Sequence, residues 1–437
     1  MKESTAIFWF RRDLRLHDNR GFHAALSSGE TVLPIFIFDR EILQGLRPND
    51  PRVSFIHKTL QNIRHTLESR SRGSIAVYYG RPLEIFRSLT SRYNVRAVYA
   101  NKDYEPYALE RDKKIGDFLR SENIELQLFK DQVIFEEDEI TKDNGDPYVV
   151  YTPYKNKWKS EFDLETALRS FPSDDYFDKL ISSQALPWKD LQDMGFESSS
   201  ITVPAFNWSS KLLENYEATR NFPALDEGTS RIGPHLRFGT VSIREIMLKA
   251  IHQKNETYWN ELIWREFFSQ ILWHFPKTMN NSFKPQYDRI KWRNNEVEFE
   301  AWKTGNTGYP LVDAGMRELN TTGYMHNRVR MLVASFLCKH LLIDWRWGEA
   351  YFAEKLLDFE LSSNIGNWQW AAGSGVDAAP YFRIFNPYTQ ADKFDKNREY
   401  IAKWVPEYQS KDYSAPIVEH KFARERCLET YKEALKS

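Results

Sequence analysis

Acidic, amide and indole side chains crowd into residues 358–370, which read DFELSSNIGNWQW. A buried polar group without a hydrogen-bond partner costs free energy, so a plain hydrophobic core would not need this many among its aromatic residues. A second polar and aromatic run, PYFRIFNP, follows at residues 380–387. The two runs therefore indicate a functional site in addition to packing.

A carboxylate and an indole stand three residues apart at Glu261 and Trp264. The pattern of residues 259–275 predicts a helix, on which residues three apart share one face. The pair could line a pocket that hydrogen-bonds and stacks a planar ligand. Taken alone, however, the spacing favours an ordinary amphipathic core helix with a surface glutamate.

Two further motifs could bind anions or line a cavity. Residues 229–239, TSRIGPHLRFG, place hydroxyl groups before a predicted helix, where free N–H groups can hold an anion, although a simple helix cap needs no more. Asn327 and Met331 are four residues apart and can face one cavity. Arg328 and Arg330 point to different faces, so one could meet a phosphate while the other pairs internally, and we expect His326 to be structural.

Five short apolar runs alternate with helical patterns in the first part of the chain. Such runs suit strands buried on both faces, and the alternation predicts an α/β domain over residues 1–130 with a doubly wound, parallel five-stranded sheet. Residues 10–13 read FRRD where a dinucleotide fingerprint would have glycines, so no typical dinucleotide site is expected there. The runs span residues 7–10, 32–38, 75–79, 97–100 and 124–128, and the helical patterns span 53–69, 82–93 and 109–121.

The remaining chain predicts a linker and a helical domain. Prolines and a triple serine loosen the pattern in residues 131–200, which we interpret as an interdomain linker. Strand-like runs nearly vanish afterwards, which predicts a larger all-α domain over residues 201–437.

Composition sets the remaining limits. The 437 residues exceed the usual size of one hydrophobic core, and 60 basic against 61 acidic residues neither indicate nor exclude nucleic-acid binding. The two cysteines form neither a disulfide framework nor a metal-ligand spacing, so no metal is expected. No apolar run could span a bilayer and no signal peptide is recognised, which predicts a soluble, cytoplasmic protein, expected to be a monomer.

Several long motifs in the same order resemble the DNA photolyase and cryptochrome family, from FWFRRDLRLHDN at residues 8–19 to PIVEHK at residues 416–421. The chain is most similar to the class I cyclobutane pyrimidine dimer photolyases. The resemblance implies that FAD binds in a U shape inside the helical domain. It further implies light-driven repair of pyrimidine dimers in DNA, in which excited reduced FAD transfers an electron to the dimer and the electron later returns.

The resemblance also assigns roles to single residues. Asn364 matches the position beside the flavin N5 edge, where a neutral amide tolerates the anionic reduced flavin and a carboxylate would repel it. Gly233 stands where some relatives have Ser, and Glu360 where many have Asp. The full set of implied FAD contacts is Tyr216, Thr229, Ser230, Arg231, Ile232, Gly233, Arg330, Asp358, Glu360 and Asn364.

Four other implied sets complete the expectation. The pocket for the flipped dimer comprises Glu261, Trp264, Asn327, Met331 and Trp370, and the electron relay comprises Trp292, Trp345 and Trp368. Contacts with DNA fall on Arg220, Arg265, Arg328 and Gln390. Arg52 and Asp103 match antenna positions of deazaflavin-binding relatives, and Tyr107-Ala108 replaces a folate-binding pair, so 8-hydroxy-deazaflavin or FMN is favoured over methenyltetrahydrofolate.

The main alternative is a cryptochrome-type blue-light photoreceptor. Plant-type cryptochromes carry Asp where this chain has Asn364, and only a short stretch follows the predicted helices, so repair is favoured. The single-strand-preferring DASH subgroup shows Asn-Tyr where this chain has Gln369-Trp370. The (6-4) photoproduct class needs a histidine pair, whereas His326 is followed by Asn327.

Overall fold

The computed structural model describes residues 4–182 and 185–436, which form two compact units. The first, here called the sheet unit, contains the residues up to Glu136 together with Glu161–Pro204 and Gly233–His252. The second, here called the helical unit, contains Glu137–Ser160, Ala205–Ile232 and the residues from Gln253 onward. The segment 131–200, which the sequence suggested as a linker, is therefore divided between the two units.

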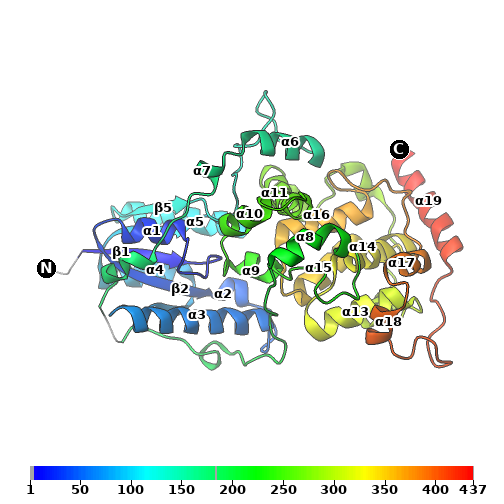
Figure 1. The fold of residues 1–437 in the computed structure, drawn as a ribbon, viewed down its shortest axis with the longest axis horizontal. Helices are drawn as coiled ribbons and strands as arrows, with labels where there is room; N and C mark the ends of the chain where they lie inside the picture. Colours follow the sequence, from blue (N-terminus) through cyan, green and yellow to red (C-terminus); the bar gives the residue numbers. More distant parts are fainter. Residues whose placement is uncertain (1–3, 183–184, 437) are drawn as a thin grey trace. The chain divides into compact units, whose positions relative to one another are not determined.

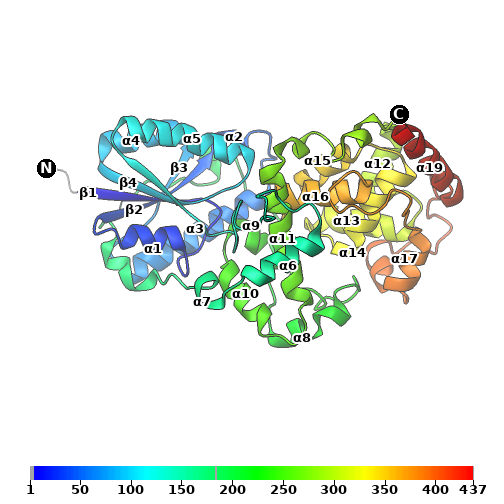
Figure 2. The same cartoon turned by 90° about the horizontal axis from the view of Figure 1, so that it is seen from above.

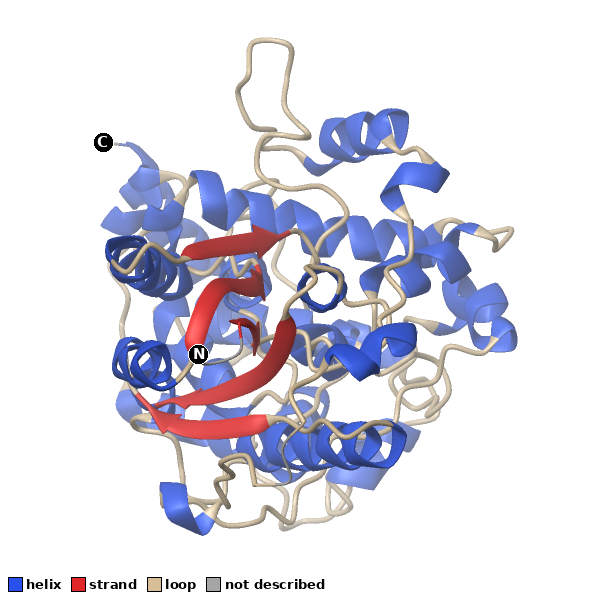
Figure 3. Cartoon of the chain, turned by 90° about the vertical axis from the view of Figure 1, so that its left-hand side faces the viewer, coloured by secondary structure: helices blue, strands red, loops and turns tan. Residues whose placement is uncertain are grey.

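A parallel, five-stranded sheet forms the centre of the sheet unit, as the sequence predicted (Figure 3). The strand order β3-β2-β1-β4-β5 is that of a doubly wound fold. Residues 6–10 of the central strand β1 are at most 2% exposed, because helices cover both faces of a parallel sheet. The strands are β1 (Ser4–Phe10), β2 (Thr31–Asp39), β3 (Ala76–Gly80), β4 (Asn94–Asn101) and β5 (Glu125–Phe129).

Helices lie on both faces of this sheet (Figure 2). Successive side chains of β1 alternate between the faces: Phe8 packs in the cluster that contains the buried residues of α1 and α3, and Trp9 in the cluster of α4 and α5. The long predicted helical segments are confirmed. The helices of this unit are α1 (Arg20–Leu26), α2 (Arg40–Leu43), α3 (Pro51–Arg70), α4 (Pro82–Arg92), α5 (Pro106–Ser121), α7 (Leu164–Ala167), α9 (Gly233–Phe238) and α10 (Ile243–Ile251).

Helices α9 and α10 pack with the sheet unit, although the sequence suggested the all-α domain for them. Buried ion pairs hold α10 in this place: the Arg244 guanidinium lies 2.9 Å from Asp18 and 2.9 Å from Asp131. These side chains are at most 7% exposed, so removing one partner would leave an uncompensated buried charge.

The helical unit confirms the predicted all-α class within the described residues (Figure 1). Its core contains the indoles of Trp302, Trp345 and Trp368, each at most 2% exposed. In the part of the chain that the structure describes, no helix has the length and apolar character needed to cross a membrane. The helices are α6 (Tyr151–Glu161), α8 (Ser210–Thr219), α11 (Thr257–His274), α12 (Glu296–Thr304), α13 (Pro310–Thr322), α14 (Asn327–Ser335), α15 (Trp345–Lys355), α16 (Leu361–Ala372), α17 (Pro387–Phe394), α18 (Glu399–Trp404) and α19 (His420–Lys436).

Candidate functional site

A cavity of about 100 Å³ in the helical unit gathers residues from three of the predicted sets, those for the flavin, the dimer and the electron relay. Its wall comes mainly from α14, α16 and the segment between α15 and α16. The predicted residues that line it are Asn327, Arg330, Met331, Asp358, Glu360, Asn364, Trp368 and Trp370. Positions expected to hold the flavin and positions expected to hold a pyrimidine dimer therefore share one cavity.

Helix α16 brings several of these side chains to the cavity. Asn364 and Trp368 are four residues apart and share one helix face. The helix ends at Gly373, whose φ of 91° is a left-handed conformation that glycine adopts readily. Gly366 allows close packing against α11, because a Cβ atom there would lie 2.2 Å from the ring of Phe268.

A bidentate ion pair closes one part of the cavity wall. The two Nη atoms of Arg330 donate to the Asp358 carboxylate over 3.1 and 2.9 Å, and its Nε donates to the Met325 carbonyl over 2.7 Å. Desolvation lowers the pKa of Arg330, but the charge and hydrogen bonds of Asp358, together with Tyr324 and Glu318, outweigh it and raise that pKa. Guanidinium has five N–H donors, so these bonds leave donors for a ligand.

The orientation of Asn364 depends on a residue that the sequence did not reveal. Its Nδ2 donates to the Glu349 carboxylate over 2.8 Å and to the Glu349 carbonyl over 3.1 Å. Both bonds use the amide nitrogen, so the amide oxygen is the atom left for a ligand in the cavity. Burial raises the pKa of Glu349, and the bond from Asn364 only partly offsets this effect.

Glu360 forms an ion pair with Arg265 at 3.1 Å. Both side chains are largely buried, at 10% and 12% exposed, and Ser363 donates a further bond to Glu360 over 3.3 Å. This placement gives no support to the predicted contact of Arg265 with DNA, because the side chain offers little surface to a phosphate. It fits instead a role in holding the acidic wall of the cavity.

Glu261 and Trp264, the other two predicted dimer contacts, lie on α11 and do not line this cavity. Glu261 forms an ion pair with Arg220, which the sequence suggested for contact with DNA. Trp264 stacks on Tyr151 with 3.6 Å between ring centroids. Arg328 donates to Asn221 and lies over the ring of Phe394, and Gln390 on α17 is half-buried.

The predicted diphosphate loop is held by tyrosines. Thr229 lies 3.3 Å from the Tyr324 hydroxyl, and Ser230 accepts a bond from Tyr258 over 2.9 Å. Tyr216 packs edge-on against Tyr258. Arg231 has a φ of 53°, which is uncommon for a residue with a side chain and marks a strained loop. Ile232 belongs to the helical unit and Gly233 already to the sheet unit.

The three predicted relay tryptophans contribute to one hydrophobic cluster. Trp345 and Trp368 are nearly fully buried, and Trp292 packs against the cluster as a partly buried residue. Gly348 of α15 makes room for Trp368, because a Cβ atom there would lie 2.1 Å from the indole. The relay role of the three tryptophans stays a prediction of the family resemblance.

The sheet unit contains a larger cavity of about 670 Å³. Its lining includes Tyr79, Phe196, Arg40 and Arg81, but neither of the two predicted antenna residues. Arg52 pairs with Asp50 at 2.7 Å. Asp103 pairs with Arg12 at 3.1 Å, and the neighbouring arginines lower the pKa of Asp103 in spite of its desolvation.

Comparisons with known proteins match both units of the chain. A sequence model described as the FAD binding domain of DNA photolyase matches residues 258–411, and one described as DNA photolyase matches residues 6–173. A deoxyribodipyrimidine photo-lyase of Halobacterium salinarum is 35% identical, with 98% of this chain and 99% of that protein covered.

Two solved structures are similar over the whole chain. A class III photolyase from Agrobacterium tumefaciens superposes with a TM-score of 0.86 at 32% identity, with 100% of this chain and 99% of that chain covered. A cryptochrome from Synechocystis gives a TM-score of 0.86 at 26% identity, with 98% and 99% covered. With relatives of this similarity along its entire length, the chain belongs to the DNA photolyase family.

Proposed function

We propose that this protein is an FAD-dependent enzyme that uses light to split cyclobutane pyrimidine dimers in DNA. The observation that carries the proposal is the shared cavity, in which Arg330, Asp358 and Asn364 lie beside Asn327, Met331 and Trp370. Electron transfer from a cofactor to a lesion needs the two close together, and one cavity lined by both sets provides this. The class I assignment stays a prediction of the sequence.

The cavity lining suits a flavin ring in its chemistry. Arg330 and Asn364 offer N–H and carbonyl groups for the polar edge, and Phe352 and Trp368 offer apolar surface for the ring faces. Its 100 Å³ is less than the roughly 300–1,000 Å³ of most small-molecule sites, so binding requires the surrounding side chains to move apart. When bound, FAD supplies the excited electron donor for the reaction.

The side chains of the cavity have separate tasks in this proposal. The Asn364 amide oxygen accepts a hydrogen bond at the reactive edge of the ring and brings no negative charge there. Trp370 and Met331 give apolar faces that exclude water from the lesion, and Asn327 hydrogen-bonds the polar edge of a base. Arg220, Arg328 and Gln390 contact the DNA backbone beside the lesion.

We further propose that the cavity of the sheet unit holds a flavin-type antenna, 8-hydroxy-deazaflavin or FMN. Its volume of about 670 Å³ suits a tricyclic ring, and Tyr79 and Phe196 offer aromatic faces. Arg40 and Arg81 offer N–H donors, and Glu41, which pairs with Arg81 at 2.8 Å, balances the charge of Arg81. The absorption spectrum of the purified protein tests this assignment. A folate-type near-ultraviolet band that disappears when Tyr79 is replaced would place a folate there instead.

The decisive experiment for the main proposal is repair of defined lesions. The purified protein is reduced, mixed with oligonucleotides that carry either a cyclobutane dimer or a (6-4) photoproduct, and illuminated. We expect restored bases only from the cyclobutane lesion and only in the light. Absence of repair combined with light-dependent binding of another protein would favour a cryptochrome-type receptor.

A further inference from the structure

Tyr151, the first residue of α6, holds the indole of Trp264 in an unusually close stack. The two ring centroids are 3.6 Å apart and the ring planes differ by 8°. Most aromatic pairs in proteins have centroids about 4.5–7 Å apart, so this stack is unusually close. Trp264 also stacks on Phe268 of its own helix, with 5.6 Å between centroids and 29° between the ring planes. Trp264 itself keeps part of its surface exposed, whereas Tyr151 is only 7% exposed.

Tyr151 is fixed from three directions. Its backbone N–H donates to the carboxylate of Asp377 over 3.2 Å, and its hydroxyl donates to the Asn260 carbonyl over 2.7 Å. The ring edge packs on Phe267, which also packs on Trp264. A side chain held at its backbone, ring and hydroxyl has little rotational freedom left, so the indole stacked on it is restrained as well.

The hydroxyl bond has a second effect on Trp264. In an α-helix the carbonyl of residue 260 accepts the N–H of residue 264, and both residues lie within α11. The Tyr151 hydroxyl therefore bonds to the same carbonyl that receives the backbone N–H of Trp264. Burial and the charge of Glu261 raise the pKa of Tyr151, which keeps the hydroxyl protonated as a donor.

We propose that Tyr151 is a positioning residue for lesion recognition, because its stack fixes the plane of Trp264, the indole predicted to receive the bases of a flipped dimer. The inference rests on the proposed function. Helix α6 would then contribute to lesion recognition indirectly, by supporting Trp264, the residue that touches the lesion. Without the stack on Tyr151, the Trp264 indole could adopt several orientations. Binding of the lesion would then cost the conformational entropy of ordering the indole.

The test compares two substitutions of Tyr151 with a matched control. Tyr151→Leu removes the stack, and Tyr151→Phe keeps the stack but removes the hydroxyl bond to Asn260. Tyr154→Leu is the control, because Tyr154 lies one turn further along α6, is 2% exposed and packs on Phe267. The measured quantity is the ratio of dark affinities for dimer-containing and undamaged oligonucleotides, together with repair yield at saturating lesion and flavin absorbance.

We expect Tyr151→Leu to lower the affinity ratio by up to about tenfold, since ordering one freed side chain on binding weakens affinity by up to roughly this factor. Tyr151→Phe should retain most of the ratio, and Tyr154→Leu should retain it fully even if both leucine variants lower the melting temperature alike. Flavin absorbance should stay normal in all three. An unchanged ratio in Tyr151→Leu, or an equal loss in Tyr154→Leu, overturns the inference.

Asp377→Ala keeps the inference testable if Tyr151→Leu does not fold. Asp377 is exposed and its carboxylate bonds the Tyr151 backbone, so its removal loosens Tyr151 without opening the core. We expect a smaller loss of the ratio, about threefold, and no loss overturns the inference. Failure of the wild-type protein to repair dimers would instead reject the proposed function, so the two failures are distinguishable.

Discussion

The side-chain nitrogen of Asn364 donates to the Glu349 carboxylate over 2.8 Å, so a residue on α15 decides which end of the amide on α16 meets the cavity. Had the amide turned, its N–H groups would face a ligand, and the acceptor would face Glu349. The pairing therefore leaves the amide oxygen of Asn364 as a neutral hydrogen-bond acceptor toward the cavity.

Replacing Glu349 by Ala should weaken the preference of the site for reduced flavin. A net hydrogen bond contributes about 0.5–1.5 kcal/mol, so we expect reoxidation in the dark to become up to about tenfold faster. Stopped-flow absorbance after anaerobic photoreduction measures it. Glu349→Gln retains an acceptor for Asn364 and should stay near wild type, and an equally fast Gln variant would contradict the explanation.

Trp370→Ala should weaken binding of the dimer while FAD stays bound. Stacking of a base on an aromatic ring contributes about 1–3 kcal/mol, so we expect at least about tenfold lower affinity in a dark binding assay. Phe422→Ala on α19 is the control, because this ring is 56% exposed and remote in sequence from the cavity motifs. Equal losses in both variants would argue against the pocket.

Trp292→Phe should impair photoreduction of oxidised flavin but leave repair by chemically reduced enzyme intact. A phenyl ring is much harder to oxidise than an indole, while it fills much of the same space. Absorbance under blue light with an external reductant measures the first property, and dimer repair measures the second. Trp188→Phe in the sheet unit should alter neither. Normal photoreduction without Trp292 would remove it from the relay.

Arg328→Gln should lower affinity for damaged and undamaged DNA alike. One lost phosphate contact reduces the slope of log affinity against log salt by about 0.9, which a titration over several salt concentrations resolves. Arg265→Gln should leave this slope unchanged, because Arg265 pairs with the largely buried Glu360, and should alter the flavin spectrum instead. A changed slope in Arg265→Gln would restore its predicted contact with DNA.

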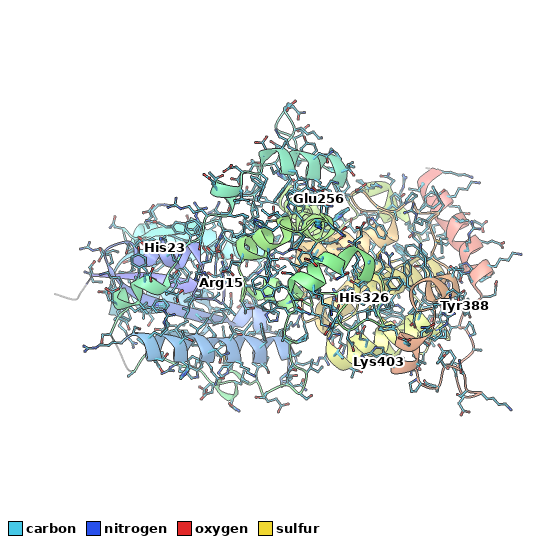
Figure 4. All side chains as sticks on the ribbon, viewed as in Figure 1. Arg15, His23, Glu256, His326, Tyr388 and Lys403 are labelled. Carbon is cyan, nitrogen blue, oxygen red and sulfur yellow. The ribbon has the colours of Figure 1, made fainter. Side chains whose placement is uncertain are left out.

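Acidification should destabilise the protein through His326 (labelled in Figure 4). Burial and nearby arginines lower the pKa of His326 from 6.5 to about 4. Between about pH 6.5 and pH 4, His326 is therefore protonated in the unfolded chain but neutral in the folded protein. The free energy of unfolding consequently falls by about 2 kcal/mol between pH 7 and pH 5.

Urea unfolding at the two pH values measures this loss. His326 caps α14 by accepting a bond from the Arg328 N–H over 3.1 Å, and Asn is a good N-cap residue. His326→Asn should therefore keep the cap and flatten the pH dependence. His252→Asn, at an exposed histidine, should leave the dependence as it is. A steep dependence in His326→Asn would assign the loss to other groups.

The strands and long helices could be predicted because their signals are local. The buried apolar runs of β1 and β2 and the proline at the start of α3, α4 and α5 each lie within a few residues of the feature they specify. The placement of α10 could not be predicted in this way. It depends on Arg244 meeting Asp18 and Asp131, more than a hundred positions earlier in the chain.

The same distinction divides the candidate site. Asn364, Trp368 and Trp370 belong to one dense motif, and the structure places all three at one cavity. Glu349 and Tyr151 lie in ordinary helical patterns, and nothing in the sequence near them indicates a function. Their contacts form only where α15 packs against α16 and where α6 packs against α11. The contact of Arg265 with DNA stays a prediction, and its burial beside Glu360 could not be read from the sequence, because an exposed and a buried arginine look alike there.

The contact between Gly348 and Trp368 gives one backbone position control over the photochemistry. Any side chain at residue 348 would push into the indole, since even its first carbon would come within 2.1 Å of it. The indole also lines the cavity, so its displacement would change the cavity wall. Variants at residue 348 would therefore present as colour or light-sensitivity phenotypes, although the glycine itself never touches the pigment, and mutational surveys that score only pocket residues would overlook them.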